Sequence, residues 1–278
     1  WRSDRPMRLA DPVCASWKAE LSLEFDCRNG KTVLAQRRHE GPLVVQKPLY
    51  PEGEAVCHAI VVHPPAGIGG GDELESCATV GRDSHALLTT PGAGKWYRSA
   101  RVWARQRLTF RVAGSLEWLP QETIVFDAAL ADMGCAVDLA PQARYIGWEI
   151  LCLGRSGSGE RFGRGACRVA TEIRREGKLL WLERGRLEGG GALLESPAGL
   201  GGRSVCATLL AAGEIEAGLV TACREVREVA VTRLPGVLVA RYLGDSSEEA
   251  KRCLARIWSV LRPPLCGREA IEPRIWRT

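Results

Sequence analysis

Hydrophobic and polar residues alternate along much of the chain, which is the pattern of a half-buried β-strand. Between Lys18 and Asp26 the apolar residues fall at every second position, with polar residues between them. Successive strand residues point to opposite faces, so this segment predicts a strand with one face in the core. The Asn29-Gly30 pair favours a tight hairpin turn, because both positions accept a positive φ, and residues 32–36 are expected to return as the second strand.

Similar short apolar segments recur through the chain, separated by Gly, Pro, Asn or Asp. A second hairpin is predicted between Arg168 and Arg184, with its turn at Glu176-Gly177. Long helical segments do not alternate with the strands, which argues against a doubly wound α/β fold and for a mainly β protein. The other strand candidates are Val56–Val62, Ala86–Thr90, Leu108–Val112, Thr123–Phe126, Ile146–Cys152, Val226–Thr232 and Val237–Leu243.

One segment, Ser246–Arg262, has the pattern of an amphipathic helix. Ser246 is a favourable N-cap, and Glu249 three residues later completes a capping box. The Pro263-Pro264 pair is expected to end this helix. Its apolar residues lie on one face at helical spacing: Ala250, Cys253, Leu254, Ile257, Trp258 and Leu261.

Composition and charge narrow the class of protein. Of the 278 residues, 45% are hydrophobic and 26% are charged, and the net charge is +5, which is typical of a globular protein. No basic run with interleaved aromatics indicates nucleic-acid binding, and a mild basic excess suits an acidic protein partner equally well. No apolar segment is long enough to span a membrane, and residues 1–12 lack the apolar region of a signal peptide. The 11 cysteines, an odd number, favour free thiols and a cytoplasmic location.

Candidate metal ligands occur first in the segment Pro48–Asp72. Cys57, His58 and His63 are close in sequence, and thiol and imidazole groups suit borderline metals such as Ni²⁺. On a strand, however, Cys57 and His58 point to opposite faces and cannot chelate one ion together. A structural role for Cys57 is favoured, and His58 and His63 are weak candidates. The glycine run 67–71 indicates a turn, since a strand pattern follows it where a dinucleotide-binding loop requires a helix.

The segment Leu88–Ser99 superficially resembles a nucleotide-binding loop. Gly94-Lys95 is similar to the end of a Walker A motif, but Thr89 stands at the position of its first glycine and Trp96 follows the lysine. A nucleotide hydrolase is therefore disfavoured. The polar residues of this segment are expected to hold a turn or to face a partner: Thr89, Thr90, Lys95, Tyr97 and Arg98.

Carboxylates are concentrated in the segment Leu116–Asp127. Glu117, Glu122 and Asp127 surround Trp118 and an apolar strand, and Glu149 has a similarly apolar setting. Paired carboxylates could serve a glycosidase, act as oxygen ligands, line a polar path, or simply lie on the surface. Near the C-terminus, Arg274 and Trp276 are residue types that often anchor interfaces, but a tail packed on its own domain explains them equally well.

Four of these segments together resemble the UreD (UreH) family of urease accessory proteins. The family pattern PLYPEG–CH–HPPGGIVGGD corresponds to Pro48–Asp72, and TTPxAxKxYRS corresponds to Thr89–Ser99. The pattern LEWLPQETIxFxGA corresponds to Leu116–Ala129, and a GR…PRIW ending corresponds to Gly267–Trp276. The order and spacing agree over most of the chain. Ala66, Gly69 and Ala128 depart from the usual Gly, Val and Gly, so the local turn geometry is in question there.

The resemblance implies a single UreD-like domain over residues 1–278, mainly β, with many short strands in a β-helical or layered architecture and a minor C-terminal helical part. It implies a scaffold without catalytic activity that binds UreF, UreG and apo-urease and assists nickel insertion. Nickel would pass through a polar interior path as a transient ligand, with no tightly bound cofactor. The candidate path residues are Asp72, Glu117, Glu122, Asp127 and Glu149, and the Ser246–Arg262 helix is a candidate partner surface.

Two alternatives remain open from the residues alone. The first is a β-rich hydrolase that uses paired carboxylates across a cleft. The second is an interaction module without a metal role. Weakly held oxygen ligands favour the nickel path over a closed thiolate site, because an ion must bind and then leave.

Overall fold

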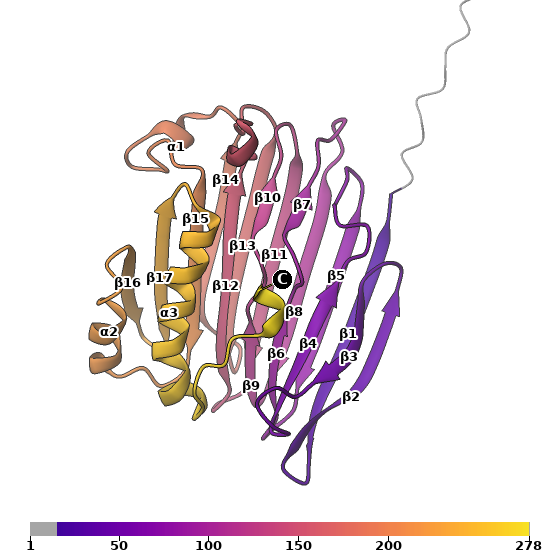
Figure 1. Cartoon of the computed structure of the whole chain (residues 1–278), viewed down its shortest axis with the longest axis vertical. Helices are drawn as coiled ribbons and strands as arrows, with labels where there is room; N and C mark the ends of the chain where they lie inside the picture. The colour runs from indigo at the N-terminus through magenta and orange to yellow at the C-terminus, as the bar shows by residue number, and fades with distance from the viewer. Residues whose placement is uncertain (1–15, 278) are drawn as a thin grey trace, which may run out of the picture.

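The computed structural model describes residues 16–277, which form two facing β-sheets with helix α3 (Ser247–Cys266) packed on the outside of one sheet (Figure 1). The expectation for residues 1–12 lies outside the described residues. Sheet A has seven strands: β1 (Lys18–Arg28), β2 (Lys31–Glu40), β5 (Glu73–Val80), β8 (Ala104–Val112), β11 (Leu130–Leu139), β13 (Ala166–Arg175) and β14 (Lys178–Glu188).

Sheet B has ten strands and forms the middle layer of the molecule. They are β3 (Val44–Leu49), β4 (Val56–Val62), β6 (His85–Thr89), β7 (Gly94–Trp96), β9 (Ser115–Trp118), β10 (Thr123–Val125), β12 (Arg144–Leu153), β15 (Val205–Ala212), β16 (Val229–Leu234) and β17 (Val237–Gly244). The short helices are α1 (Ala192–Glu195), α2 (Ala217–Cys223) and the 3₁₀ turns η1 (Ser156–Ser158) and η2 (Arg274–Arg277). None of the helices within 16–277 is both long and apolar enough to cross a bilayer.

The chain winds between the two sheets as a flattened β-helix. From β4 to β13 it alternates between sheet B and sheet A, so that β5, β8, β11 and β13 run parallel in sheet A. In the same way β4, β6, β9 and β12 run parallel in sheet B. Antiparallel strands flank this body at both ends. The prediction of a mainly β fold with many short strands and a C-terminal helix is confirmed.

Two hydrophobic cores hold the layers together, one between the sheets and one between sheet B and α3. Strand β1 has only one covered face, and its buried residues alternate as predicted: Ala19, Leu21, Leu23 and Phe25. Sheet B is covered on both faces, so β6 is buried along its whole length. Cys57 faces the inter-sheet core, whereas His58 points the other way, toward Glu52.

Both predicted hairpins are present. Asn29 (φ 53°) and Gly30 (φ 78°) form the turn between β1 and β2. Glu176 (φ 49°) and Gly177 (φ 75°) form the turn between β13 and β14. Positive φ at both central positions matches the twist of the flanking strands.

Helix α3 begins as predicted but ends later. The Ser246 hydroxyl accepts a hydrogen bond from the Glu249 amide at 3.1 Å. The expected end at Pro263-Pro264 is wrong, because the helix continues to Cys266 and is capped by Gly267 (φ 68°). A proline disrupts a helix by removing one backbone donor and crowding the preceding turn. Here that cost falls in the last turn, where the buried ion pairs of Arg262 hold the backbone in place.

The family departures Ala66 and Ala128 adopt left-handed backbone conformations, with φ of 59° and 63°. An L-residue with a Cβ is strained there by roughly 1–2 kcal/mol, whereas glycine is not. We therefore expect Ala128→Gly to stabilise the protein by about 0.5–1 kcal/mol in urea unfolding. The matched control is Ala136→Gly in the extended strand β11, where a glycine should destabilise by a similar amount. A loss of stability in both variants would contradict the strain at Ala128.

Candidate functional site

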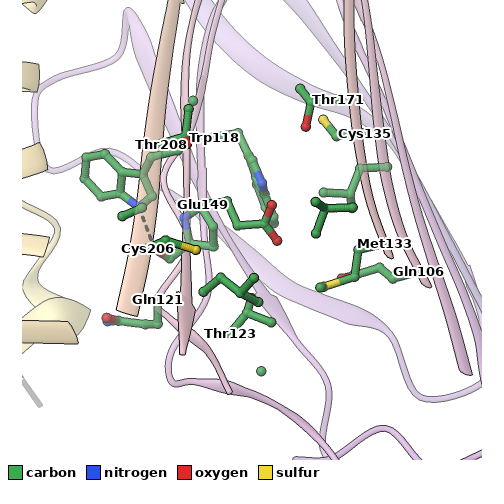
Figure 2. A pocket seen from close by; sticks show the side chains of 18 of the residues that line it. Gln106, Trp118, Gln121, Thr123, Met133, Cys135, Glu149, Thr171, Cys206 and Thr208 are labelled. Carbon is green, nitrogen blue, oxygen red and sulfur yellow. Dashed lines mark hydrogen bonds between the residues drawn. The ribbon is translucent and has the colours of Figure 1, made fainter. Parts of the chain in front are cut away.

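A cavity of about 710 Å³ lies between sheets A and B. Figure 2 shows side chains from both sheets pointing into it, with Glu149 and Cys206 from sheet B and Met133, Cys135 and Thr171 from sheet A. Each of these residues occupies an inward position of an alternating strand, which is why residues far apart in sequence meet here. Most of the wall is apolar, so each polar group in it is conspicuous.

Glu149, on β12, is the carboxylate that reaches furthest into the interior of this cavity. Figure 2 shows its side chain extending from sheet B toward the strand that carries Met133 and Cys135. It forms no hydrogen bond or ion pair with any residue between 16 and 277. Burial raises the pKa of this carboxyl to about 7, and the negative charge of Glu183 adds to the shift. Glu149 can therefore exchange a proton or accept a cation near neutral pH.

The cavity reaches the protein surface at two places. At one end its lining includes the exposed loop residues Ala66, Pro91 and Gly92. At the other end it includes the exposed residues Arg241 and Leu243 of β17. Sheet A ends at β14 on this side, whereas sheet B continues through β15, β17 and β16. The inner face of β17 is therefore left partly uncovered, and the cavity forms a passage between two openings with Glu149 between them.

Two thiols line the same cavity, on opposite sheets. Burial raises the pKa of both Cys135 and Cys206 to about 12, with a further contribution from the nearby charge of Glu149. Both thiols are therefore protonated at neutral pH, and a thiol that keeps its proton is a poor metal ligand. The ten cysteines of the described residues are all unpaired, in agreement with the expectation of free thiols.

His63 lines the cavity at the loop end. Its Nε2 atom is buried and has no hydrogen-bond partner within residues 16–277. Burial lowers the pKa of this imidazole, although the negative charge of Asp72 opposes the shift. The ring is therefore neutral at pH 7 and can act as a ligand. The other weak candidate, His58, is engaged by Glu52 at 2.5 Å on the far side of sheet B.

Glu117 lies in a buried polar network between sheet B and α3, outside the cavity. Its carboxylate accepts hydrogen bonds from His85 at 2.6 Å and from the Arg262 Nε at 3.0 Å. The Arg262 guanidinium also forms two hydrogen bonds with Glu52, at 2.6 and 2.8 Å. Burial alone would raise the pKa of both carboxyls, but their His and Arg partners outweigh it; Glu52 falls to about 2 and the pKa of Glu117 is also lowered.

The remaining predicted path residues also have other surroundings. Asp72 accepts hydrogen bonds from the backbone amides of Trp17 and Gly69, at 2.8 and 2.7 Å. Asp127 binds the backbone and side chain of Arg164. Glu122 is half-buried near Lys251. Of the five predicted carboxylates, the structure thus brings Glu149 alone to the cavity. No group of three or more His, Cys, Asp or Glu side chains in the described part of the chain is arranged to hold a metal.

The residues predicted to hold structure or an interface are mostly engaged in local contacts. Thr89 donates to the Leu119 carbonyl at 2.6 Å and accepts from Trp276 at 2.9 Å, so it ties the C-terminal segment to sheet B. Thr90 accepts from the Gln121 amide at 2.9 Å. Lys95 lines the loop opening of the cavity. Tyr97 stacks on Phe126, Arg98 bridges to the strand at Ala129, and Arg274 is exposed.

Two groups of residues were not predicted from the sequence. The first is Glu183 and Arg241, which line the second opening and form an ion pair at 2.7 Å. The second is Glu52, His85 and Arg262, which complete the buried network around Glu117. Local spacing gives no signal for either group, since the partners are 58 to 210 residues apart. An arginine on the apolar face of the Ser246–Arg262 helix was the one available clue.

Comparison with known proteins identifies relatives over nearly the whole chain. Residues 18–277 match the family described as UreD urease accessory protein. A urease accessory protein UreD of Azoarcus sp. (strain BH72) is 56% identical over 99% of this chain and 98% of its own length. That of Dechloromonas aromatica (strain RCB) is 54% identical over 95% of both chains. That of Methylobacillus flagellatus is 47% identical over 94% of this chain and 95% of its own.

Proposed function

The chain belongs to the UreD family of urease accessory proteins, and from this premise we propose that it conducts nickel through the cavity between its sheets during nickel insertion into apo-urease. The relatives are accessory proteins and not enzymes, so the carboxylate-based hydrolase alternative is set aside. In the proposed function the protein acts in a complex with UreF and UreG, and nickel is its cargo.

The observation that carries this proposal is the unpartnered Glu149 in a cavity with two openings. A cation in an apolar passage needs at least one compensating negative charge, because burying an unpaired ion is costly. Glu149 supplies that charge when it is ionised, and His63 offers a neutral nitrogen ligand at the loop end. Single ligands of this kind bind an ion weakly and allow it to leave.

The path we propose is narrower than the one predicted from the sequence. Glu149 and His63 are retained as its ligands. Asp72 and Asp127 use their oxygens to hold loops, and Glu117 is enclosed in the network with Arg262. These three are therefore assigned to the stability of the fold, and Glu122, which is half-buried near Lys251, is left without a role in the path.

The test is activation of purified apo-urease by nickel in the presence of UreF, UreG and variants of the full chain. Glu149→Ala should lower the activation rate roughly tenfold, the range found when a group that supports metal binding is removed. Thr208→Phe, which fills the cavity beside Glu149 without changing charge, should also lower it. Both variants should still co-purify with the partners, because neither side chain lies on the outer surface.

Glu75→Ala provides a matched control, since Glu75 is an exposed carboxylate on β5 at the outer face of sheet A. Its activation rate should equal that of the unmodified chain. Normal activation by both Glu149→Ala and Thr208→Phe would remove the passage from the mechanism. In that event the alternative of an interaction module without a metal role would be the better account.

A further inference from the structure

The second opening of the cavity is crossed by an ion pair that joins the two sheets. The Arg241 Nη2 atom on β17 lies 2.7 Å from the Glu183 Oε1 atom on β14. Among the ion pairs of residues 16–277, it alone links a strand of sheet A to a strand of sheet B. Both residues line the cavity, and the Arg241 guanidinium also lies 5.9 Å from the centre of the Trp181 ring.

The pair stands directly in front of the interior groups. Arg241 is paired in register with Thr208 on β15, and the cavity thiol Cys206 is paired with Leu243. Glu149 in turn is paired with Thr208 from the other side, on β12. The charges of Glu149, Glu183 and Arg241 all act on the Cys206 thiol, which places the four groups close together. A molecule that enters between β14 and β17 therefore meets the ion pair first, then Cys206 and Glu149.

We propose that the Glu183–Arg241 pair is a latch on this opening, and that a divalent cation passes it by taking the place of the Arg241 guanidinium at Glu183. The identity of the cation as nickel rests on the proposed function, whereas the latch itself does not. The side chains are 48% and 30% exposed, so solvent and salt weaken the pair and it can open often. Glu183 then provides one carboxylate at the surface, and Glu149 provides the next one inside.

Opening of the latch can be measured without metal or partners, through the reactivity of Cys206 in the full chain. Iodoacetamide labelling followed by peptide mass spectrometry gives the rate at Cys206, and Cys77 on sheet A serves as a reference in the same molecule. Arg241→Gln and Glu183→Gln should each speed labelling of Cys206 by about two- to fivefold, the factor expected for loss of an exposed ion pair. Labelling of Cys77 should not change.

Three controls separate a latch from general loosening. Arg241→Lys keeps the charge and should label at nearly the original rate, and the exchanged pair Glu183→Arg with Arg241→Glu should restore slow labelling. Arg186→Gln breaks an exposed pair with Glu188 within β14 and should have no effect. Added salt should speed labelling of Cys206 in the unmodified chain but not in Arg241→Gln. Equal rates in the unmodified chain and Arg241→Gln, or parallel increases at Cys206 and Cys77, would overturn the latch.

Cation exchange is tested by comparing two variants that open the latch equally. Arg241→Gln leaves the Glu183 carboxylate free, so urease activation should be maintained or faster. Glu183→Gln removes the carboxylate on which the ion lands, so activation should fall. Equal activation by the two variants would overturn the exchange at Glu183. Faster labelling combined with normal activation by Glu149→Ala and Thr208→Phe would leave the latch intact and reject the nickel passage instead.

Discussion

Replacing Arg262 with methionine is expected to destabilise the protein by about 3–5 kcal/mol, the usual cost of removing one partner from a buried ion pair. The Arg262 side chain is completely buried and binds Glu52 and Glu117 together. Methionine fills much of the same volume but leaves two buried carboxylates with histidine as their remaining ionisable partner. Urea unfolding of the full chain, followed by tryptophan fluorescence, gives the free energy of unfolding.

Arg256→Met is the matched control, because Arg256 lies on the exposed face of the same helix. Its free energy of unfolding should stay within about 0.5 kcal/mol of the original value. Arg262→Lys should fall between the two, since lysine keeps the charge but cannot bind a carboxylate with two parallel N–H groups. A loss below about 1 kcal/mol in Arg262→Met would show that the network does not hold α3 on sheet B.

Replacing Glu149 with glutamine is expected to stabilise the protein at alkaline pH while impairing nickel insertion. The folded-state pKa of Glu149 is about 7, against 4.5 as its ordinary value. The folded chain therefore holds the proton that the unfolded chain releases between these two values. Stability contributed by the protonated form is complete below about pH 4.5 and is lost as the pH rises through 7. Above pH 8 the ionised side chain costs about 3 kcal/mol, which glutamine avoids.

The measurement is urea unfolding of Glu149→Gln and of the unmodified chain at pH 5, 6, 7 and 8. The difference in free energy of unfolding should be small at pH 5 and should grow to about 3 kcal/mol at pH 8. Glu75→Gln, at an exposed position on β5, should show no such trend. Parallel stability curves for Glu149→Gln and the unmodified chain would show that the carboxylate is not confined in an apolar cavity.

These two expectations point to different roles for buried charge in one molecule. Glu117 and Glu52 are fully compensated by Arg262 and two histidines, so they stabilise the fold and are not available to a ligand. Glu149 lacks a compensating partner within residues 16–277, so it lowers stability at neutral and alkaline pH and remains available to a cation. Sites that bind ligands commonly carry such a stability cost.

The sequence by itself determined the features that depend on neighbouring residues. Alternation of apolar positions predicted β1, and positive-φ pairs predicted the turns at Asn29-Gly30 and Glu176-Gly177. The Ser246 cap predicted the start of α3, and opposite strand faces separated Cys57 from His58. Motif order predicted the family, because four matched segments in one order seldom arise by chance.

Only the tertiary structure decided which charged groups meet. Glu117 and Glu149 look alike in sequence, yet one faces α3 and the other faces sheet A, because sheet B is covered on both sides. Arg262 also carried the helix beyond the point at which Pro263 was expected to stop it. Partners such as Glu183 and Arg241 lie 58 residues apart, and their approach depends on how the two sheets end. Local patterns determine the direction of a side chain relative to its own strand, but the opposing surface is set by the winding of the whole chain.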